Sequence, residues 1–214
     1  MKTESINGRT ISFADHVDEI RTLYGPPSEI AARKSLPCLD EHCRHFISRS
    51  PFVCLSSAAA DGAADVSPRG DSPGFVRVLD DSTLFLPDRL GNNRIDTMMN
   101  IVQNPCIGLI FFIPGVNETL RVNGLGRIVL QSELLAESRV DGKTPKSGLL
   151  IEVREAFLQC AKALIRSKLW MTDQVLPREQ FPTLGKILVD QIGLTMPVPE
   201  LDALIDQAYR EKLY

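Results

Sequence analysis

The spacing of strand-like segments between residues 51 and 90 constrains the fold of this chain more than any other feature. Short apolar runs alternate there with turn signals such as Asp61-Gly62 and Asp80-Asp81, which are typical of hairpins. A parallel sheet would need a helix between successive strands, and this region has no room for one. The pattern therefore predicts a mainly β protein, an antiparallel barrel with peripheral helices. The expected strands are 52–55, 63–67, 75–79, 83–86, 106–113, 120–130 and 149–158.

Helices are expected on both sides of this β-rich region. Apolar residues from Phe13 to Tyr24 recur every three or four positions, and Ser28 and Asp40 are candidate N-caps of two further helices. The buried stripe of the third helix would consist of Cys43, Phe46 and Ile47. We expect a helical segment 1–50 that packs on a barrel domain 51–172, followed by a helical tail 173–214.

One helix is expected within the β-rich region, over residues 94–103. Its apolar residues recur at helical spacing and share one side. They are Ile95, Met98, Met99 and Val102.

Composition and charge exclude several classes of protein. The 214 residues are 43% hydrophobic and 24% charged, with a net charge of −3 and scattered basic residues, which argues against a nucleic-acid surface. The N-terminus has no apolar signal sequence, and the longest strongly apolar run, 106–114, is too short to span a bilayer. Five cysteines without CxxC spacing fit reduced thiols, so we expect a cytoplasmic protein. Cys54 and Cys106 lie in apolar runs and are expected in the core.

Three segments carry candidate binding residues. In residues 65–74, Ser67 offers a hydroxyl and Arg69 a guanidinium for an anion or ring oxygen, although a loop with a surface arginine is the common alternative. In residues 86–94, Asn92, Asn93 and Arg94 precede a predicted helix, where free N–H groups favour a phosphate. Either asparagine could instead be the N-cap.

The third segment is 160–170, after the last predicted strand. Lys162 and Arg166 are four residues apart, and Trp170, the single tryptophan, continues the same predicted helical row. A solvated basic face is the ordinary explanation, whereas two cations beside an indole also suit an anionic aromatic ligand.

Other catalytic patterns receive no support. His42 and His45 could share a helical face, but no acid or cysteine completes a metal-ligand set with them or with His16. The sequence contains no GxSxG, P-loop or GxGxxG motif.

Taken in order, the motifs resemble the pyridoxamine 5′-phosphate oxidase-like superfamily of FMN-binding split-barrel proteins, in particular its probable FMN-dependent enzymes. The similarity covers roughly residues 20–172, and the order and spacing of the motifs make it specific. The motifs are Ser50-Pro51-Phe52-Val53, residues 65–71, Pro73-Gly74-Phe75, Pro87-Asp88-Arg89, Gly91-Asn92, Asn104-Pro105, Pro114-Gly115, residues 120–124, Cys160-Ala161-Lys162-Ala163, Arg166-Ser167 and Leu169-Trp170.

The resemblance implies a homodimer with FMN at the subunit interface. The isoalloxazine ring would lie along Val66, Ser67, Pro68 and Arg69, with Leu86, Pro87 and Asp88 beside it. The phosphate would bind Asn92, Asn93 and Arg94, and the second subunit would contribute Thr119, Arg121, Lys162, Arg166 and Trp170. The oxidase itself has Ser-Arg-Lys where this chain has Asn92-Asn93-Arg94, so one cation replaces two.

These residues suggest a flavoprotein oxidoreductase that transfers a hydride between FMN and a small organic substrate. The chain lacks the pyridoxal-phosphate signature of the oxidase, which argues against vitamin B6 oxidation. Two alternatives remain open: a flavin carrier or sensor without turnover, and a haem-handling split barrel with His16, His42 or His45 as ligand.

Overall fold

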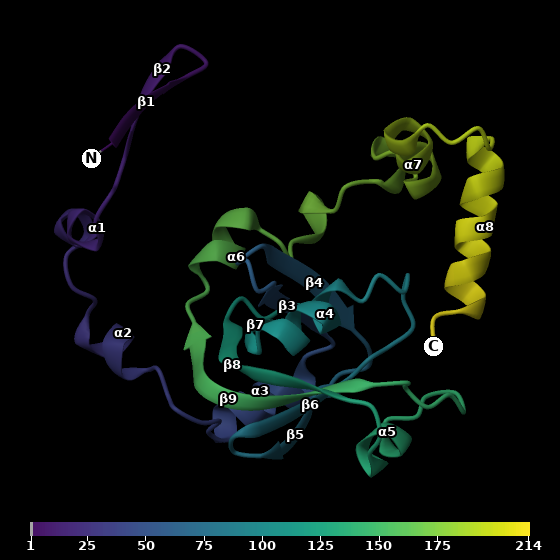
Figure 1. The fold of residues 1–214 in the computed structure, drawn as a ribbon, viewed down its shortest axis with the longest axis horizontal. Coiled ribbons are helices and arrows are strands. Elements are labelled where there is room, and N and C mark those ends of the chain that lie inside the picture. The colour runs from purple at the N-terminus through teal and green to yellow at the C-terminus, as the bar shows by residue number, and fades with distance from the viewer. Residues whose placement is uncertain (1) are drawn as a thin grey trace. The chain divides into compact units, whose positions relative to one another are not determined.

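The structure, a computed structural model, describes residues 2–214. The described chain separates into two compact units, residues 2–35 and Leu36–Tyr214, whose helices and strands are labelled in Figure 1. The larger unit therefore includes the third N-terminal helix and the helical tail together with the barrel. The boundaries of the three expected segments, 1–50, 51–172 and 173–214, stay a prediction.

The N-terminal unit begins with a hairpin that sequence reasoning missed. Strands β1 (Lys2–Ile6) and β2 (Arg9–Phe13) pair across Asn7-Gly8, and both turn residues have positive φ, 51° and 76°. Asn-Gly favours this type of two-residue turn, so the expectation of a wholly helical N-terminus was wrong. The helices α1 (Val17–Tyr24) and α2 (Glu29–Arg33) follow as expected, and Ser28 caps α2 by accepting from Ala31 N.

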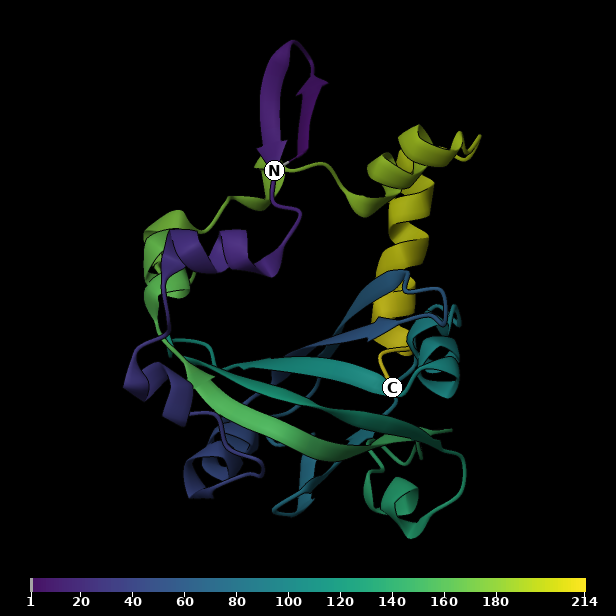
Figure 2. The ribbon, with the colours of Figure 1, turned by 60° about the vertical axis from the view of Figure 1, so that its left-hand side comes forward.

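The larger unit is built on one seven-stranded antiparallel sheet, with strand order β4-β3-β7-β8-β9-β6-β5. This arrangement confirms the mainly β split-barrel fold with peripheral helices, and Figure 2 shows the twist and curvature of the long strands. The strands are β3 (Phe52–Ala58), β4 (Ala64–Gly70), β5 (Arg77–Asp80), β6 (Thr83–Pro87), β7 (Cys106–Phe112), β8 (Thr119–Val129) and β9 (Gly148–Gln159).

The helices of this unit surround the sheet or follow it. They are α3 (Glu41–Arg49), α4 (Asp96–Gln103), α5 (Glu133–Glu137), α6 (Lys162–Ser167), α7 (Leu184–Ile192) and α8 (Val198–Glu211), with short 3-10 turns at Thr172–Gln174 and Arg178–Gln180. As expected, Asp40 caps α3 by accepting from Cys43 N over 2.8 Å. Sequence reasoning missed α5.

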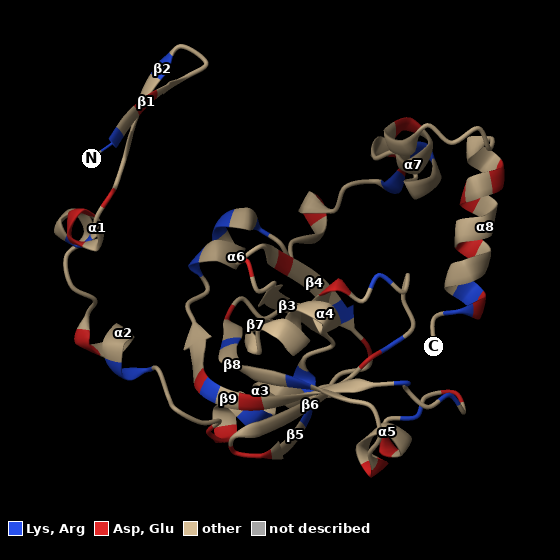
Figure 3. Cartoon of the chain, in the orientation of Figure 1, with Lys and Arg blue, Asp and Glu red and all other residues tan. Residues whose placement is uncertain are grey.

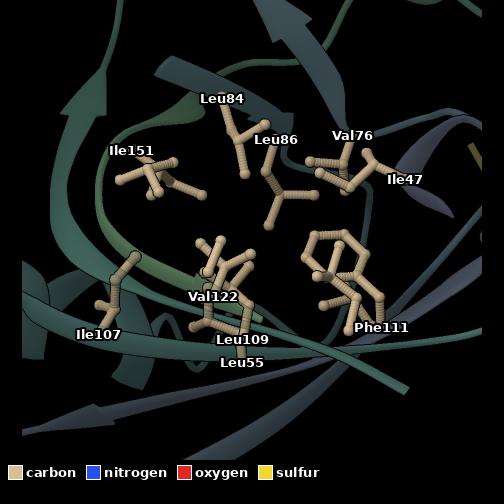
Figure 4. Close-up of a cluster of buried hydrophobic side chains, with 14 of the residues drawn as sticks. Ile47, Leu55, Val76, Leu84, Leu86, Ile107, Leu109, Phe111, Val122 and Ile151 are labelled. Atoms are coloured by element: carbon tan, nitrogen blue, oxygen red, sulfur yellow. The ribbon is translucent and has the colours of Figure 1, made fainter. Parts of the chain in front are cut away.

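The core fills the space enclosed by the sheet, and Figure 4 shows part of it, with side chains from α3, from the loop before β5 and from β3, β6, β7, β8 and β9. Phe111, Leu109 and Val122 alternate with outward-facing residues on β7 and β8, as the period of two in a half-buried strand requires. Cys43, Phe46 and Ile47 of α3 are buried as predicted.

The packing of α4 was not predicted, and the expectation that Cys54 and Cys106 lie in the core was wrong. The side of α4 that meets the sheet carries Thr97 and Ile101, whereas Ile95, Met99 and Val102 are exposed and Met98 is half-buried. Thr97 on this side makes a polar contact with Asp65 of β4, which apolar periodicity cannot detect. Cys106 is exposed and Cys54 only half-buried, because both lie on the outward face of their strands.

The strand that carries the first candidate segment lies at the edge of the sheet. β4 pairs only with β3 among the described strands, in a register that places Ser67 opposite Leu55. Pro68 sits in the middle of β4, a position that edge strands tolerate because one side of the strand needs no ladder donor.

Candidate functional site

Alternation along β4 divides its side chains between two environments. Asp65, Ser67 and Arg69 are half-buried, whereas Val66 and Pro68 are exposed on the opposite face. Polar side chains thus face inward from an edge strand. This is the arrangement expected where a strand borders a ligand site rather than a purely apolar core.

The loop from Pro87 to Ile95 lies beside β4, and two ion pairs join them. Arg69 Nη1 donates to Asp88 Oδ1 over 2.8 Å, and Arg89 Nε donates to Asp71 Oδ2 over 2.6 Å. Arg89 Nη1 also donates to the Ser138 carbonyl oxygen over 2.8 Å. These pairs bring together two segments that are about twenty residues apart in sequence.

Arg69 and Asp88 form the inner wall between the loop and the strand. Their side chains are 25% and 26% exposed, and burial raises the pKa of Asp88 although Arg69 acts in the opposite direction. Arg69 Nε is shielded from solvent and has no hydrogen-bond partner among the described residues. A buried donor without an acceptor costs free energy, so this position favours an incoming acceptor atom.

The asparagines of the loop do not cap α4. The N-cap position is Ile95, with φ of 52° and no side-chain cap, and Asn92 Oδ1 accepts from Arg94 N over 3.1 Å instead. The Arg94 guanidinium bonds Asp96 over 2.8 Å and is 72% exposed. The N-cap alternative for Asn92 and Asn93 is therefore wrong, and the first turn of α4 keeps N–H groups without side-chain caps.

A polar network fixes the start of α4 against β3 and β4. Thr97 Oγ1 donates to Asp65 Oδ2 over 2.9 Å, and Asn100 Nδ2 donates to Ser57 Oγ over 3.1 Å. Thr97 and Ser57 are buried, so these bonds are shielded from water. The loop before α4 is thus held at both ends, by this network and by the two ion pairs.

Together these segments line a pocket of about 730 Å³. This volume falls within the range of roughly 300–1,000 Å³ that is usual for small-molecule and cofactor sites. Five basic side chains against three acidic side chains give the lining side chains a formal charge of +2. The basic residues are Arg69, Arg89, Arg94, Lys143 and Lys146, and the carboxylates are Asp65, Asp88 and Asp96.

The family follows from a comparison of the sequence with models of known families. The model described as pyridoxamine 5′-phosphate oxidase matches residues 39–160, more than half of the chain. The chain belongs to this family. The matched range includes α3, all seven strands of the barrel and the residues that line the pocket, apart from Tyr214.

Nine of the fifteen predicted cofactor-binding residues line the pocket of this family member, and a tenth, Leu86, borders a small crevice behind Arg69 and Asp88. The nine are Val66, Ser67, Pro68, Arg69, Pro87, Asp88, Asn92, Asn93 and Arg94. Sequence reasoning missed the wall formed by residues 143–146. Two lysines in a Gly-containing turn, Asp141 to Ser147, were the available signal.

The other five predicted residues lie elsewhere on this oxidase-family chain. Thr119 and Arg121 belong to β8, where Arg121 bonds Glu155 over 3.4 Å and its guanidinium lies 4.7 Å from the Phe157 ring centre. Lys162 and Arg166 are exposed on the basic helix α6 (Figure 3). Their contribution from a partner subunit stays a prediction.

The sequence suggested that Trp170 continues the helical row of Lys162 and Arg166. The structure shows that it does not. The helix α6 ends at Ser167, and Lys168 turns the chain with φ of 52°. The indole Nε1 then donates to the Val116 carbonyl oxygen over 2.8 Å, so Trp170 is half-buried against the loop between β7 and β8.

The histidines are absent from the described residues that line the pocket. His16, His42 and His45 are exposed. The described residues also contain no cluster of three or more groups able to hold a metal ion.

Comparisons with individual proteins add only distant likenesses. The search of curated proteins gives no match. Among solved structures, HupZ from Group A Streptococcus is 18% identical, with a TM-score of 0.46 over 56% of this chain and 93% of HupZ. A putative pyridoxamine 5′-phosphate oxidase from Lactobacillus delbrueckii is 18% identical, with a TM-score of 0.45 over 57% of this chain and 95% of its own.

A third structure is that of HutZ, a haem-storage protein from Vibrio cholerae. It is 14% identical, with a TM-score of 0.38 over 56% of this chain and 94% of HutZ. At such identities and TM-scores nothing follows about the ligand of this chain.

No helix in residues 2–214 is long and apolar enough to cross a membrane.

Proposed function

We propose that this chain binds FMN in the pocket between β4 and the Pro87–Ile95 loop and acts as an FMN-dependent oxidoreductase on a small organic substrate. The observation that carries the proposal is the buried, unsatisfied Arg69 Nε in a pocket with more cations than carboxylates. An aromatic ligand with ring oxygens and a phosphate supplies acceptors for both. The volume of the pocket and the chemistry of its donors therefore fit the group.

The residues divide by the part of FMN that they suit. Ser67 and Arg69 offer donors to the polar edge of the ring, and Leu86 and Pro87, both buried, provide apolar surface beside it. Asn92, Asn93 and Arg94 offer amide and guanidinium donors to the phosphate. The uncapped N–H groups at the start of α4 add partial positive charge at the same place.

FMN, when bound, supplies the hydride-transfer chemistry, and the protein supplies binding and orientation. Asp88 keeps Arg69 in place through their 2.8 Å contact, so the guanidinium needs little reorganisation to meet an acceptor. The half-buried position of both side chains strengthens this pairing relative to bulk water.

The proposal includes a homodimer in which a partner subunit covers the pocket. The residues assigned to that role are Thr119, Arg121, Lys162, Arg166 and Trp170. Arg121 Nε is buried without a hydrogen-bond partner among the described residues, which supports a role in contacting a group outside this chain.

Absorbance of the purified protein, with mass spectrometry of ligand released by heat, tests the proposal. A flavin spectrum and a mass equal to FMN are expected. Bleaching by NADH or NADPH, with reoxidation by a substrate, would separate an enzyme from a flavin carrier without turnover. A Soret band instead of a flavin spectrum would overturn the proposal in favour of haem handling, and failure of the apoprotein to bind added FMN would overturn it outright.

A further inference from the structure

The segment after α8 returns to the pocket and ends against its wall. Tyr214 lines the pocket together with Arg89 and Lys143. The Tyr214 hydroxyl donates to Asp71 Oδ1 over 2.9 Å, and the Arg89 guanidinium lies 5.6 Å from the centre of the tyrosine ring. Tyr214 belongs to a part of the chain that neither the family match nor the sequence motifs cover.

Tyr214 also engages Lys143, one of the basic residues that line the pocket. Lys143 Nζ donates to the main-chain oxygen of Tyr214 over 2.8 Å. While Tyr214 is in place, the Lys143 ammonium is directed at the protein's own backbone. An anionic ligand and Tyr214 therefore compete for the same lysine.

The rest of the tail is held weakly to the barrel. α8 buries none of its residues, and α7 buries only Gly185, whose N–H donates to Asp202 Oδ1 of α8 over 2.9 Å. α7 and α8 thus pack on each other. Among the described residues, the hydrogen bonds that join residues 181–214 to the barrel are those of Tyr214. A segment with few buried contacts opens at low cost in free energy.

We propose that the segment Lys212–Tyr214 is a lid on the pocket, closed by Tyr214 and displaced when an anionic ligand enters. The ligand class rests on the proposed function, whereas the closed state rests only on the contacts of Tyr214. Because coupling is reciprocal, the factor by which closure of the lid lowers ligand affinity equals the factor by which bound ligand lowers the equilibrium constant for closure. Ligand binding would thereby release α7 and α8 from the barrel.

The closed state is tested first without ligand, by amide hydrogen exchange of the full-length apoprotein. Tyr214→Ala should speed exchange in peptides covering residues 87–95 and 140–147, and Tyr214→Phe, which loses only the hydroxyl, should have a smaller effect. Tyr209→Ala is the control, because Tyr209 is an exposed α8 residue outside the pocket lining. Unchanged exchange in Tyr214→Ala would overturn the lid.

Competition is tested by stopped-flow mixing of apoprotein with FMN, followed by flavin fluorescence. Tyr214→Ala should bind about tenfold faster than wild type, the change in open population that follows from losing a hydrogen bond to a charged group. Slower or weaker binding by Tyr214→Ala would make the residue a fixed wall and overturn the lid. If no variant binds FMN, the proposed function fails, and hydrogen exchange still decides whether Tyr214 closes the pocket.

Discussion

Arg89 donates from Nε to Asp71 Oδ2 over 2.6 Å, and the Asp71 side chain is only 2% exposed. This buried pair joins the end of β4 to the loop that precedes α4. The Ser138 carbonyl oxygen accepts a second hydrogen bond from the same guanidinium, from Arg89 Nη1. Two of the three guanidinium nitrogens of Arg89 therefore donate to the protein itself. We assign it to building the pocket and Arg69 to meeting the ligand.

The first prediction concerns this pair. Arg89→Gln should lower the free energy of unfolding by about 3–5 kcal/mol, because the variant leaves the Asp71 carboxylate buried without its counter-charge. Urea denaturation of the apoprotein measures the change. Arg33→Gln is the control: its pair with Glu29 is about 80% exposed on both sides, so stability should change by less than about 1 kcal/mol. Equal effects of the two substitutions would contradict the structural role of Arg89.

A second prediction addresses Arg69. Arg69→Gln should weaken FMN binding about ten- to a hundredfold, which corresponds to about 1.5–3 kcal/mol for a hydrogen bond to a charged group. It should also raise the pKa of Asp88 further, because the guanidinium opposes the effect of burial on that carboxyl. Fluorescence titration of flavin gives the affinity. The control is Arg154→Gln, because the Arg154 side chain is 58% exposed beside Glu152, and this variant should bind FMN like wild type. If Arg69→Gln also binds FMN with wild-type affinity, Arg69 is not part of the site.

Backbone packing at the junction of β8 and β9 gives a third prediction. A Cβ on Gly124 would lie 2.2 Å from the Glu152 carbonyl oxygen, where the register between the strands shifts. Gly124→Ala should therefore destabilise the protein by about 1–3 kcal/mol or more, since the obstacle is backbone. Gly91→Ala should be neutral or slightly stabilising, because Gly91 has open space and an ordinary φ. Thermal unfolding of both variants decides, and a Gly124→Ala midpoint equal to wild type would refute the packing argument.

The fourth prediction follows from the burial of Cys43, which raises the pKa of its thiol to about 11, with the nearby Asp40 adding to the effect. The folded state thus favours the neutral thiol. This contribution to stability is complete below the ordinary pKa of cysteine and is lost as pH rises through about 11. At pH 8 a thiol reagent should react quickly with the exposed Cys38, Cys106 and Cys160, and with Cys43 only after urea is added. Rapid reaction of all five cysteines in the folded protein would contradict this account.

Trp170 provides the fifth prediction, which tests the proposed contribution of a partner subunit. Trp170→Ala should lower FMN affinity and shift sedimentation toward the monomer together, because an indole beside an interface ligand stabilises both. Trp170→Phe keeps an aromatic ring and removes the donor, so it measures the effect of losing only the hydrogen bond to the Val116 carbonyl oxygen. Leu169→Ala, at a neighbouring exposed position, controls for general surface change. If Trp170→Ala alters only thermal stability, the residue is a local anchor of its loop.

Sequence reasoning was most successful where local chemistry decides the structure. The turn signals between residues 51 and 90 located β3 to β6, and the caps Ser28 and Asp40 lie where they were expected. The grouping of Ser67, Arg69 and Asp88 in one pocket was also anticipated. That grouping came from resemblance, because spacing alone does not show which loops meet.

The failures arose where distant contacts decide. The buried side of α4 includes Thr97, which bonds Asp65, thirty-two residues away in sequence, and helical spacing of apolar residues does not reveal such a contact. Lys143 and Tyr214 reach the pocket from loops whose sequences carry only weak signals. The hairpin around Asn7-Gly8 is different: its turn signal was present in the sequence and was overlooked.

Pro68 has a consequence for the behaviour of the protein in crowded solution. An unprotected edge strand recruits strands from other molecules, and such additions are the beginning of aggregates. At the centre of β4 a proline supplies no amide hydrogen, so an incoming strand cannot form an unbroken ladder along this edge. The residue that helps to shape a ligand pocket thereby also works as a gatekeeper against misassembly.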